Sequence, residues 1–226
     1  MLLADPAYVV PPPGPPGPVG TMAWLRATVS RFASGETHTR RRAIAESLLA
    51  DLDPEALRAA ARAAAPLAAA PPPPAPGDVV ALPYLPVAVL AAATGVASAD
   101  LAAAVDAVRV VAAAYHPGTD APGADAALAR LLALLPAGEP EVVAQRVAVL
   151  VQACEATAAL VRGALTRPLE EVLRDTPPVP ATRRVGPDGE VVMIDLAGHP
   201  FGAGPRACPG EAHARALAQG VVEGAR

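Results

Sequence analysis

Residues 201–210, FGAGPRACPG, constrain the fold of this chain more than any other stretch. Three glycines and two prolines fall within these ten residues, so the segment cannot continue a helix or a central strand and is expected to form a loop. Glycine allows backbone conformations and close approaches that a side chain would block. The loop can therefore press its backbone against a flat ligand and point amide groups at the sulfur of Cys208.

The segment after this loop is expected to form a helix over residues 209–218, with Pro209 at the first helical position and Glu211 near the positive end of the helix dipole. Cys208 would then lie at a helix N-terminus, which lowers the pKa of a thiol and favours the thiolate that binds metals. Arg206, two residues earlier, adds positive potential. A lone cysteine is nevertheless usually a small buried hydrophobic residue, so the spacing of the whole stretch must decide.

That spacing resembles the signature Phe-Gly-x-Gly-x-Arg-x-Cys-x-Gly of the cytochrome P450 superfamily at every fixed position. The matching residues are Phe201, Gly202, Gly204, Arg206, Cys208 and Gly210. The resemblance implies a mainly α fold, a helical heme domain with a small β-hairpin. It also implies a b-type heme (iron protoporphyrin IX) whose axial ligand is the thiolate of Cys208, which pushes electron density toward O–O cleavage.

Two cationic side chains, His38 and Arg42, stand four residues apart in a helix expected over about residues 37–52, so they share one face. Two donors one turn apart make a clamp for a carboxylate, although the arginines between them also suit a solvated basic face. The pattern Gly35-x-x-His38-x-x-x-Arg42 resembles the second heme-contacting helix of the same family. This resemblance implies that His38 and Arg42 bind a heme propionate.

The longest helix is expected over residues 140–165 and contains Glu155 among apolar residues, where a carboxylate is costly unless it has a task or a partner. It resembles the family's central helix, in which an acid and a hydroxyl relay protons to bound dioxygen. Glu155 matches the acid, Ala156 stands at the hydroxyl position, and Thr157 follows one residue later, a rotation of about 100°. Glu155 and Thr157 are thus the candidate catalytic residues, although Thr157 could equally bond to its own helix. Cys154 is expected to be a packed core thiol.

The pattern Glu171-x-x-Arg174, in a short helix that ends before Pro177 and Pro178, predicts an intrahelical ion pair. Such a pair is usually worth less than about 1 kcal/mol. It also resembles the buried structural Glu-x-x-Arg pair of the family.

Residues 181–185 and 190–194 flank a Gly-Pro-Asp-Gly turn and predict a β-hairpin. Strand alternation turns one of Arg183 and Arg184 inward. In the family an arginine here binds the second propionate, and we choose Arg183.

The remaining chain predicts a single shortened domain over residues 1–226, with a proline-rich arm at 1–20 and a proline-rich break at 71–77. Relative to the family, the chain is expected to lack the N-terminal sheet region and the Phe-x-x-Pro-x-x-Phe meander, because its only phenylalanines are Phe32 and Phe201. Further helices are expected at 21–34, 53–70, 85–96, 98–115 and 124–135, with Ser98 capping the fourth of these.

Composition excludes several classes of protein. A net charge of -4 gives no reason to expect a nucleic-acid partner. The two cysteines contain no Cys-x-x-Cys pattern, which argues against a disulfide framework or a structural zinc site. Neither a signal peptide nor an uncharged run of membrane-spanning length is apparent, so a cytoplasmic location without membrane contact is expected.

The resemblance as a whole implies a heme-thiolate monooxygenase that inserts one oxygen atom from O2 into a small organic substrate. Its electrons would come from a ferredoxin or a flavoprotein, and arginines near the cysteine would suit an acidic donor. Two alternatives stay open: a non-catalytic relative that binds or assists another protein, and a degenerate remnant without a stable fold.

Overall fold

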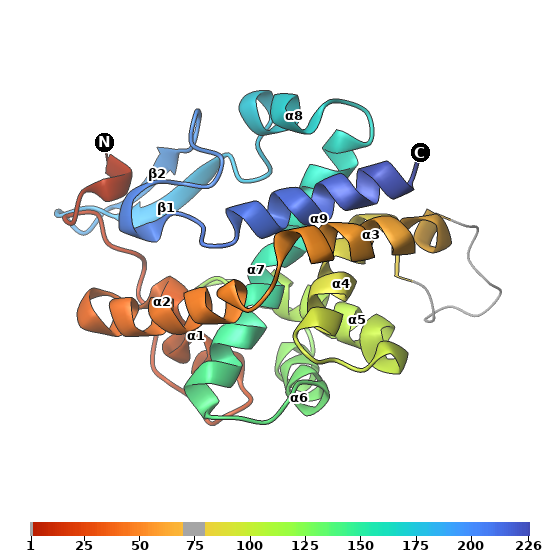
Figure 1. Cartoon of the computed structure of the whole chain (residues 1–226). Helices are drawn as coiled ribbons and strands as arrows, with labels where there is room; N and C mark the ends of the chain where they lie inside the picture. Colours follow the sequence, from red (N-terminus) through yellow and green to blue (C-terminus); the bar gives the residue numbers. More distant parts are fainter. Residues whose placement is uncertain (1, 70–79) are drawn as a thin grey trace.

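A computed structural model describes residues 2–69 and 80–226, so the proline-rich break predicted at 71–77 lies outside the described residues. The described chain is mainly helical with one antiparallel β-hairpin, as the sequence predicts (Figure 1). Its α-helices are α1 Met22–Thr28, α2 Gly35–Ala50, α3 Pro54–Ala69, α4 Leu85–Ala93, α5 Leu101–Ala113, α6 Ala124–Leu134, α7 Pro140–Ala164, α8 Leu169–Asp175 and α9 Glu211–Gly224. The strands are β1 Ala181–Val185 and β2 Val191–Asp195.

Helix α7 runs through the middle of the molecule, and α2, α4, α5 and α9 pack around it (Figure 1). It is long and apolar enough to cross a membrane, but 56% of its most apolar window is buried inside the protein. Eight of its buried side chains, between Ala144 and Val161, join one core cluster that includes residues of α3, α4, α5 and α9. Helix α7 therefore serves as the core helix of this fold.

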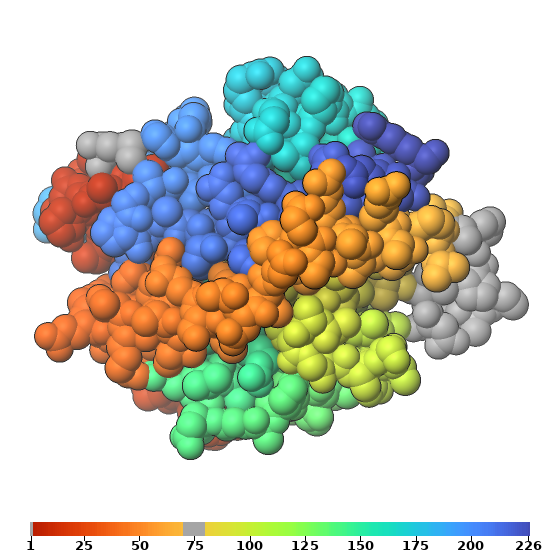
Figure 2. All heavy atoms as spheres, viewed as in Figure 1, coloured from red at the N-terminus to blue at the C-terminus, as the bar shows by residue number. Residues whose placement is uncertain are grey.

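Helices α3 and α9 lie side by side on the face shown in Figures 1 and 2. Their close approach depends on Gly220 and Gly224, one turn apart on α9. A methyl group at Gly220 would collide with the carbonyl oxygen of Arg58 and come within 3.0 Å of the Ala61 Cβ. A methyl group at Gly224 would lie 2.8 Å from the Ala65 Cβ. Backbone therefore packs against backbone at this crossing, and no side chain fits between the two helices.

The helix predicted over 21–34 is interrupted, which corrects the sequence analysis. Helix α1 ends at Thr28, Val29 is extended, and a separate 3₁₀ turn covers Ser30–Phe32. The fully buried Gln145 of α7 causes the break: its Oε1 accepts from the Ser30 amide at 3.0 Å and its Nε2 donates to the Thr28 carbonyl at 3.0 Å. These bonds satisfy backbone groups that a continuous helix would have paired internally.

A smaller correction concerns the helix predicted from Ser98. Ser98 opens a 3₁₀ turn, Ser98–Asp100, and its side chain caps no helix; α5 begins at Leu101. The helices predicted over 37–52, 53–70, 124–135 and 140–165 agree with the structure to within two residues at each described end. Helix α4 ends at Ala93 rather than at residue 96, and α9 covers Glu211–Gly224 rather than 209–218. Asp53 caps α3 as expected, accepting a hydrogen bond from the Glu55 amide at 3.1 Å.

The hairpin forms at the predicted place, and the N-terminal segment is attached to it. Strands β1 and β2 pair with Thr182 opposite Ile194 and Arg184 opposite Val192. Val9 adds a single antiparallel bridge to Val185. A 3₁₀ turn at Leu2–Ala4 then packs on the turn Gly204–Arg206, so the beginning of the chain lies against the cysteine loop.

Candidate functional site

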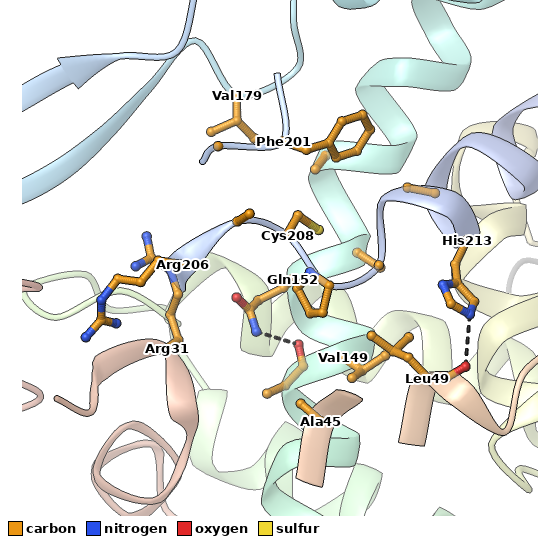
Figure 3. Close-up of a pocket in the computed structure, with 18 of the residues that line it drawn as sticks. Arg31, Ala45, Leu49, Val149, Gln152, Val179, Phe201, Arg206, Cys208 and His213 are labelled. Atoms are coloured by element: carbon orange, nitrogen blue, oxygen red, sulfur yellow. Dashed lines mark hydrogen bonds between the residues drawn. The ribbon is translucent and has the colours of Figure 1, made fainter. Parts of the chain in front are cut away.

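A cavity of about 300 Å³ lies between α7, α2, the β-hairpin and the loop that carries Cys208. One wall comes from α7 and is largely apolar, with Val149, Ala153, Ala156 and Leu160 beside the polar Gln145, Gln152 and Thr157. The opposite wall is the cysteine loop, as Figure 3 shows. All of the site residues predicted from the sequence line this cavity except Glu155 and Arg183.

The cysteine loop forms a tight turn that glycine alone makes easy. Gly202 and Gly204 have φ values of +74° and +69°, in the left-handed region. The Cys208 amide donates to the Phe201 carbonyl at 2.7 Å, which closes the loop. Helix α9 begins at Glu211 with Gly210 as its N-cap, so Pro209 precedes the helix rather than opening it. The loop thus holds Cys208 just before the N-terminus of α9.

The Cys208 thiol is exposed through the mouth of the cavity, yet protein atoms surround much of its sulfur. Desolvation by these walls raises its pKa, and a hydrogen bond from the Gly210 amide and the nearby Arg42 charge lower it only in part. The lowering of the Cys208 pKa that was expected from the helix terminus is therefore outweighed by burial. A bound cation at the sulfur would still deprotonate it, because a coordinated thiol ionises outright.

Several cationic side chains line the cavity, and no aspartate or glutamate of the described residues does. Arg206 donates to the Ala33 carbonyl at 2.7 Å, and Arg42 pairs with Glu46 at 2.6 Å. Burial, together with the charges of Arg206 and Arg42, lowers the pKa of His38. This concentration of like charge in a partly buried space favours an anionic ligand.

The inward-facing arginine of the hairpin is Arg184, not Arg183. Arg184 is only 4% exposed, lines the cavity and donates to the Thr182 hydroxyl at 2.7 Å, whereas Arg183 is exposed. Burial and the charges of Arg31 and Arg206 lower the pKa of Arg184 to about 10. The hairpin pattern contains a signal for this choice. Asp195 and Arg183 lie on the same face of the hairpin, and a charged pair of residues marks that face as the one toward solvent, which leaves Arg184 on the inner face.

Glu155 points away from the cavity, which corrects its predicted role. Its carboxylate is exposed, accepts a hydrogen bond from the Tyr84 hydroxyl at 3.2 Å and lies 3.8 Å from the Arg162 guanidinium. Tyr84 and Arg162, which stabilise this carboxylate, therefore lie outside the cavity lining. Cys154, fully buried, is the packed thiol that was expected, and burial raises its pKa to about 12.

Thr157 does line the cavity, and it is also bonded to its own helix. Its side chain is 3% exposed, and its hydroxyl donates to the Ala153 carbonyl at 2.6 Å. Thr157 is therefore bonded to its own helix, as one of the two interpretations predicts, and it also faces the cavity; its catalytic role stays a prediction. Its hydrogen is engaged by the backbone, while its oxygen keeps an acceptor site.

Glu171 and Arg174 do not form the predicted pair. The Arg174 side chain is 67% exposed and bonds Asp175 at 2.8 Å, while Glu171 lies 3.9 Å from Arg167. Both are surface residues of α8 rather than a buried pair behind the site.

Two basic residues of the cavity, Arg31 and His213, were missed by sequence reasoning. Arg31 lies in the 3₁₀ turn after α1 and carries no recognisable motif. His213 of α9 lies with Nε2 3.0 Å from both the Leu49 and the Leu52 carbonyls, and so links α9 to the end of α2 (Figure 3). In the sequence, the only signal for His213 is its position five residues after Cys208, in the helix that follows the cysteine loop.

No protein-family model matches this sequence, and no curated protein matches it. Solved structures do match. CYP164A2 of Mycobacterium smegmatis with econazole bound is 19% identical, with a TM-score of 0.67. P450BioI in complex with an acyl carrier protein bearing hexadec-9Z-enoic acid is 16% identical, with a TM-score of 0.65. CYP109E1 from Bacillus megaterium in complex with testosterone is 16% identical, with a TM-score of 0.62. Each match covers 98% of this chain and 80% of the solved chain. The chain therefore has the fold of bacterial cytochromes P450, in a form shorter than those solved chains.

Proposed function

We propose that this chain is a shortened heme-thiolate monooxygenase, a single domain over residues 1–226. The observation that carries the proposal is that Cys208, a cationic cluster and an apolar helix face line one cavity. In a cytochrome P450 fold, this is the donor set that a b-type heme requires: a sulfur for the iron, cations for two propionates, and flat apolar walls.

The residues present fit the group. Cys208 would ligate the iron, and Phe201, Gly202 and Gly210 would form the surface beneath the macrocycle. His38, Arg42, Arg206 and Arg184 would bind the propionates, with Arg184 replacing the Arg183 of the sequence prediction. When bound, the heme supplies O–O cleavage and the transfer of one oxygen atom from O2 to the substrate, with electrons from a ferredoxin or flavoprotein partner.

The chain's own residues prepare the site in three ways. The cysteine loop holds the Cys208 sulfur in place through the hydrogen bond between its amide and the Phe201 carbonyl. The apolar side chains of α7, with Val149, Ala153 and Ala156, suit a small apolar substrate. The Thr157 oxygen can accept a hydrogen bond from a cavity water, which a proton transfer at this wall would use.

The solved neighbours support a small organic substrate, since their structures contain econazole, testosterone and an acyl carrier protein bearing hexadec-9Z-enoic acid. We further propose a cytoplasmic protein without membrane or nucleic-acid partners.

A second candidate function is a non-catalytic heme-binding or helper protein. Glu155 lies outside the cavity, and the Thr157 hydrogen is already bonded to Ala153. Both observations weaken the proton relay without weakening the binding site.

The test is the absorbance spectrum of the purified protein, reduced under carbon monoxide, beside Cys208→Ala and a control, Cys154→Ala. A thiolate-type red-shifted Soret band is expected in the wild type and in the control, and its loss is expected in Cys208→Ala. Substrate turnover in the presence of a ferredoxin system then separates the monooxygenase from the heme-binding helper. Soluble protein that takes up no heme would refute both heme functions.

A further inference from the structure

Arg31 is held on the cavity wall by its two neighbours in the chain. The Ser30 amide donates to the buried Gln145 at 3.0 Å, which ties this turn to α7. The Phe32 ring is 5% exposed and packs on Tyr115, with 5.2 Å between the ring centroids. A side chain whose backbone is anchored on both sides loses little freedom when it binds a ligand.

The charge of Arg31 is not matched by an acid. Within the part of the chain that the structure describes, no carboxylate lies within ion-pair distance of its guanidinium, whereas Arg42 on the same cavity has Glu46. Burial lowers the pKa of Arg31, and Tyr115 counteracts it only in part. The contact between Arg31 and the Phe32 ring, 5.8 Å to the centroid, is near the outer limit of a cation–π interaction and does not neutralise the charge.

Arg31 is also close to the other cavity arginines. All three side chains line the same cavity, and burial together with the charge of Arg31 lowers the pKa of Arg184. Figure 3 shows Arg31 and Arg206 together at one end of the cavity. These arginines come from three distant segments: the turn after α1, strand β1 and the cysteine loop. Three cations on one cavity, with no carboxylate among the described residues that line it, favour an anion there.

We propose that Arg31, Arg184 and Arg206 form a carboxylate-binding cluster in which Arg31 directly contacts one propionate of the tetrapyrrole. This inference rests on the proposed heme site and adds a binding residue that no motif of the chain marks. Guanidinium groups suit the task because their planar fork bonds a carboxylate through two parallel hydrogen bonds.

Metal-free protoporphyrin IX and its dimethyl ester test the inference, because they differ only in the carboxylates and need neither iron nor turnover. Binding to the chain as purified without heme is followed by quenching of Trp24, the single tryptophan. The variants are Arg31→Gln, Arg31→Lys and the control Arg130→Gln, which removes an exposed arginine of α6 outside the cavity. Circular dichroism checks that each variant is folded.

We expect Arg31→Gln to bind protoporphyrin IX about 10- to 100-fold more weakly than the wild type, the effect of losing a charged hydrogen-bond donor. Its affinity for the dimethyl ester should change little. The affinity of Arg31→Lys for protoporphyrin IX should be intermediate, and this variant replaces Arg31→Gln in the test if the glutamine variant does not fold. Arg130→Gln should bind with the affinity of the wild type. Unchanged protoporphyrin affinity in Arg31→Gln, or in Arg31→Lys if only that variant folds, would overturn this inference alone. A folded wild type that binds neither porphyrin would overturn the heme site together with it.

Discussion

Replacing Gly220 by alanine tests the close crossing of α3 and α9. In an exposed helix this change is stabilising by about 1 kcal/mol, because glycine is the poorer helix former. Here the new methyl group would meet the Arg58 carbonyl oxygen and lie 3.0 Å from the Ala61 Cβ. Neither atom can rotate away, since one is backbone and the other has no rotamer. The helices must separate, and overpacking of this kind costs about 1–3 kcal/mol.

The two effects have opposite signs, so the measured sign is informative. At the upper end of the overpacking range, we expect a net loss of about 2 kcal/mol in the free energy of unfolding. For a chain of this size, that loss lowers Tm by about 4–8 °C. Urea unfolding followed by circular dichroism gives the free energy, and an unchanged m-value shows that the two unfolding transitions are comparable.

Gly163→Ala provides the matched control within α7. A methyl group there would lie 2.8 Å and 3.1 Å from the two γ carbons of Val172; these are side-chain atoms rather than backbone, so a smaller loss than at Gly220 is expected. A Gly220→Ala protein that is more stable than the wild type would refute the backbone-to-backbone packing of α3 and α9.

Three further predictions concern the site. Arg184→Gln should weaken heme binding about tenfold or more, and Arg183→Gln should leave it within about twofold; heme titration of the two variants in parallel checks the corrected choice, and a reversed order would contradict it. Glu155→Gln should change turnover per bound heme by less than about threefold, because the carboxylate lies outside the cavity; a loss of two orders of magnitude would restore its relay role. Burial and the charges of Arg206 and Arg42 lower the pKa of His38, and Glu46 opposes this only in part. The neutral imidazole of His38 therefore contributes stability above its unfolded pKa of about 6.5, and this contribution is lost as the pH falls toward the lower pKa of the folded state. Stability measured by urea unfolding should therefore fall from pH 7 to pH 5, less steeply in His38→Gln, and equal slopes would argue against the burial of this imidazole.

Local signals located the regular elements and the cysteine loop well. Asp53 followed by Pro54 marks the start of α3, and the two glycines with positive φ in the cysteine loop are the residues that such a turn requires. The start of a helix and the shape of a tight loop are determined by residues only a few positions away in the sequence. For that reason a single sequence is enough to place them.

The errors arose where distant residues decide. The break after Thr28 depends on Gln145, 117 residues away, and no local pattern announces it. The direction of Glu155 depends on the rotation of α7 about its axis, and one residue changes that direction by about 100°. Arg184 could have been chosen correctly from the hairpin register, but Arg31 could not, because its neighbours on the cavity come from β1 and the cysteine loop.

The contact between the turn Leu2–Ala4 and the turn Gly204–Arg206 bears on the order in which the protein assembles. It closes a loop of about 200 residues, whose entropic cost exceeds that of a ten-residue loop by roughly 2.7 kcal/mol. Leu3 also forms part of the cavity wall, so the wall is complete only when the two most distant parts of the chain have met. We therefore expect the mouth of the cavity to form last during folding. In native-state hydrogen exchange, it should open well before the α7 core.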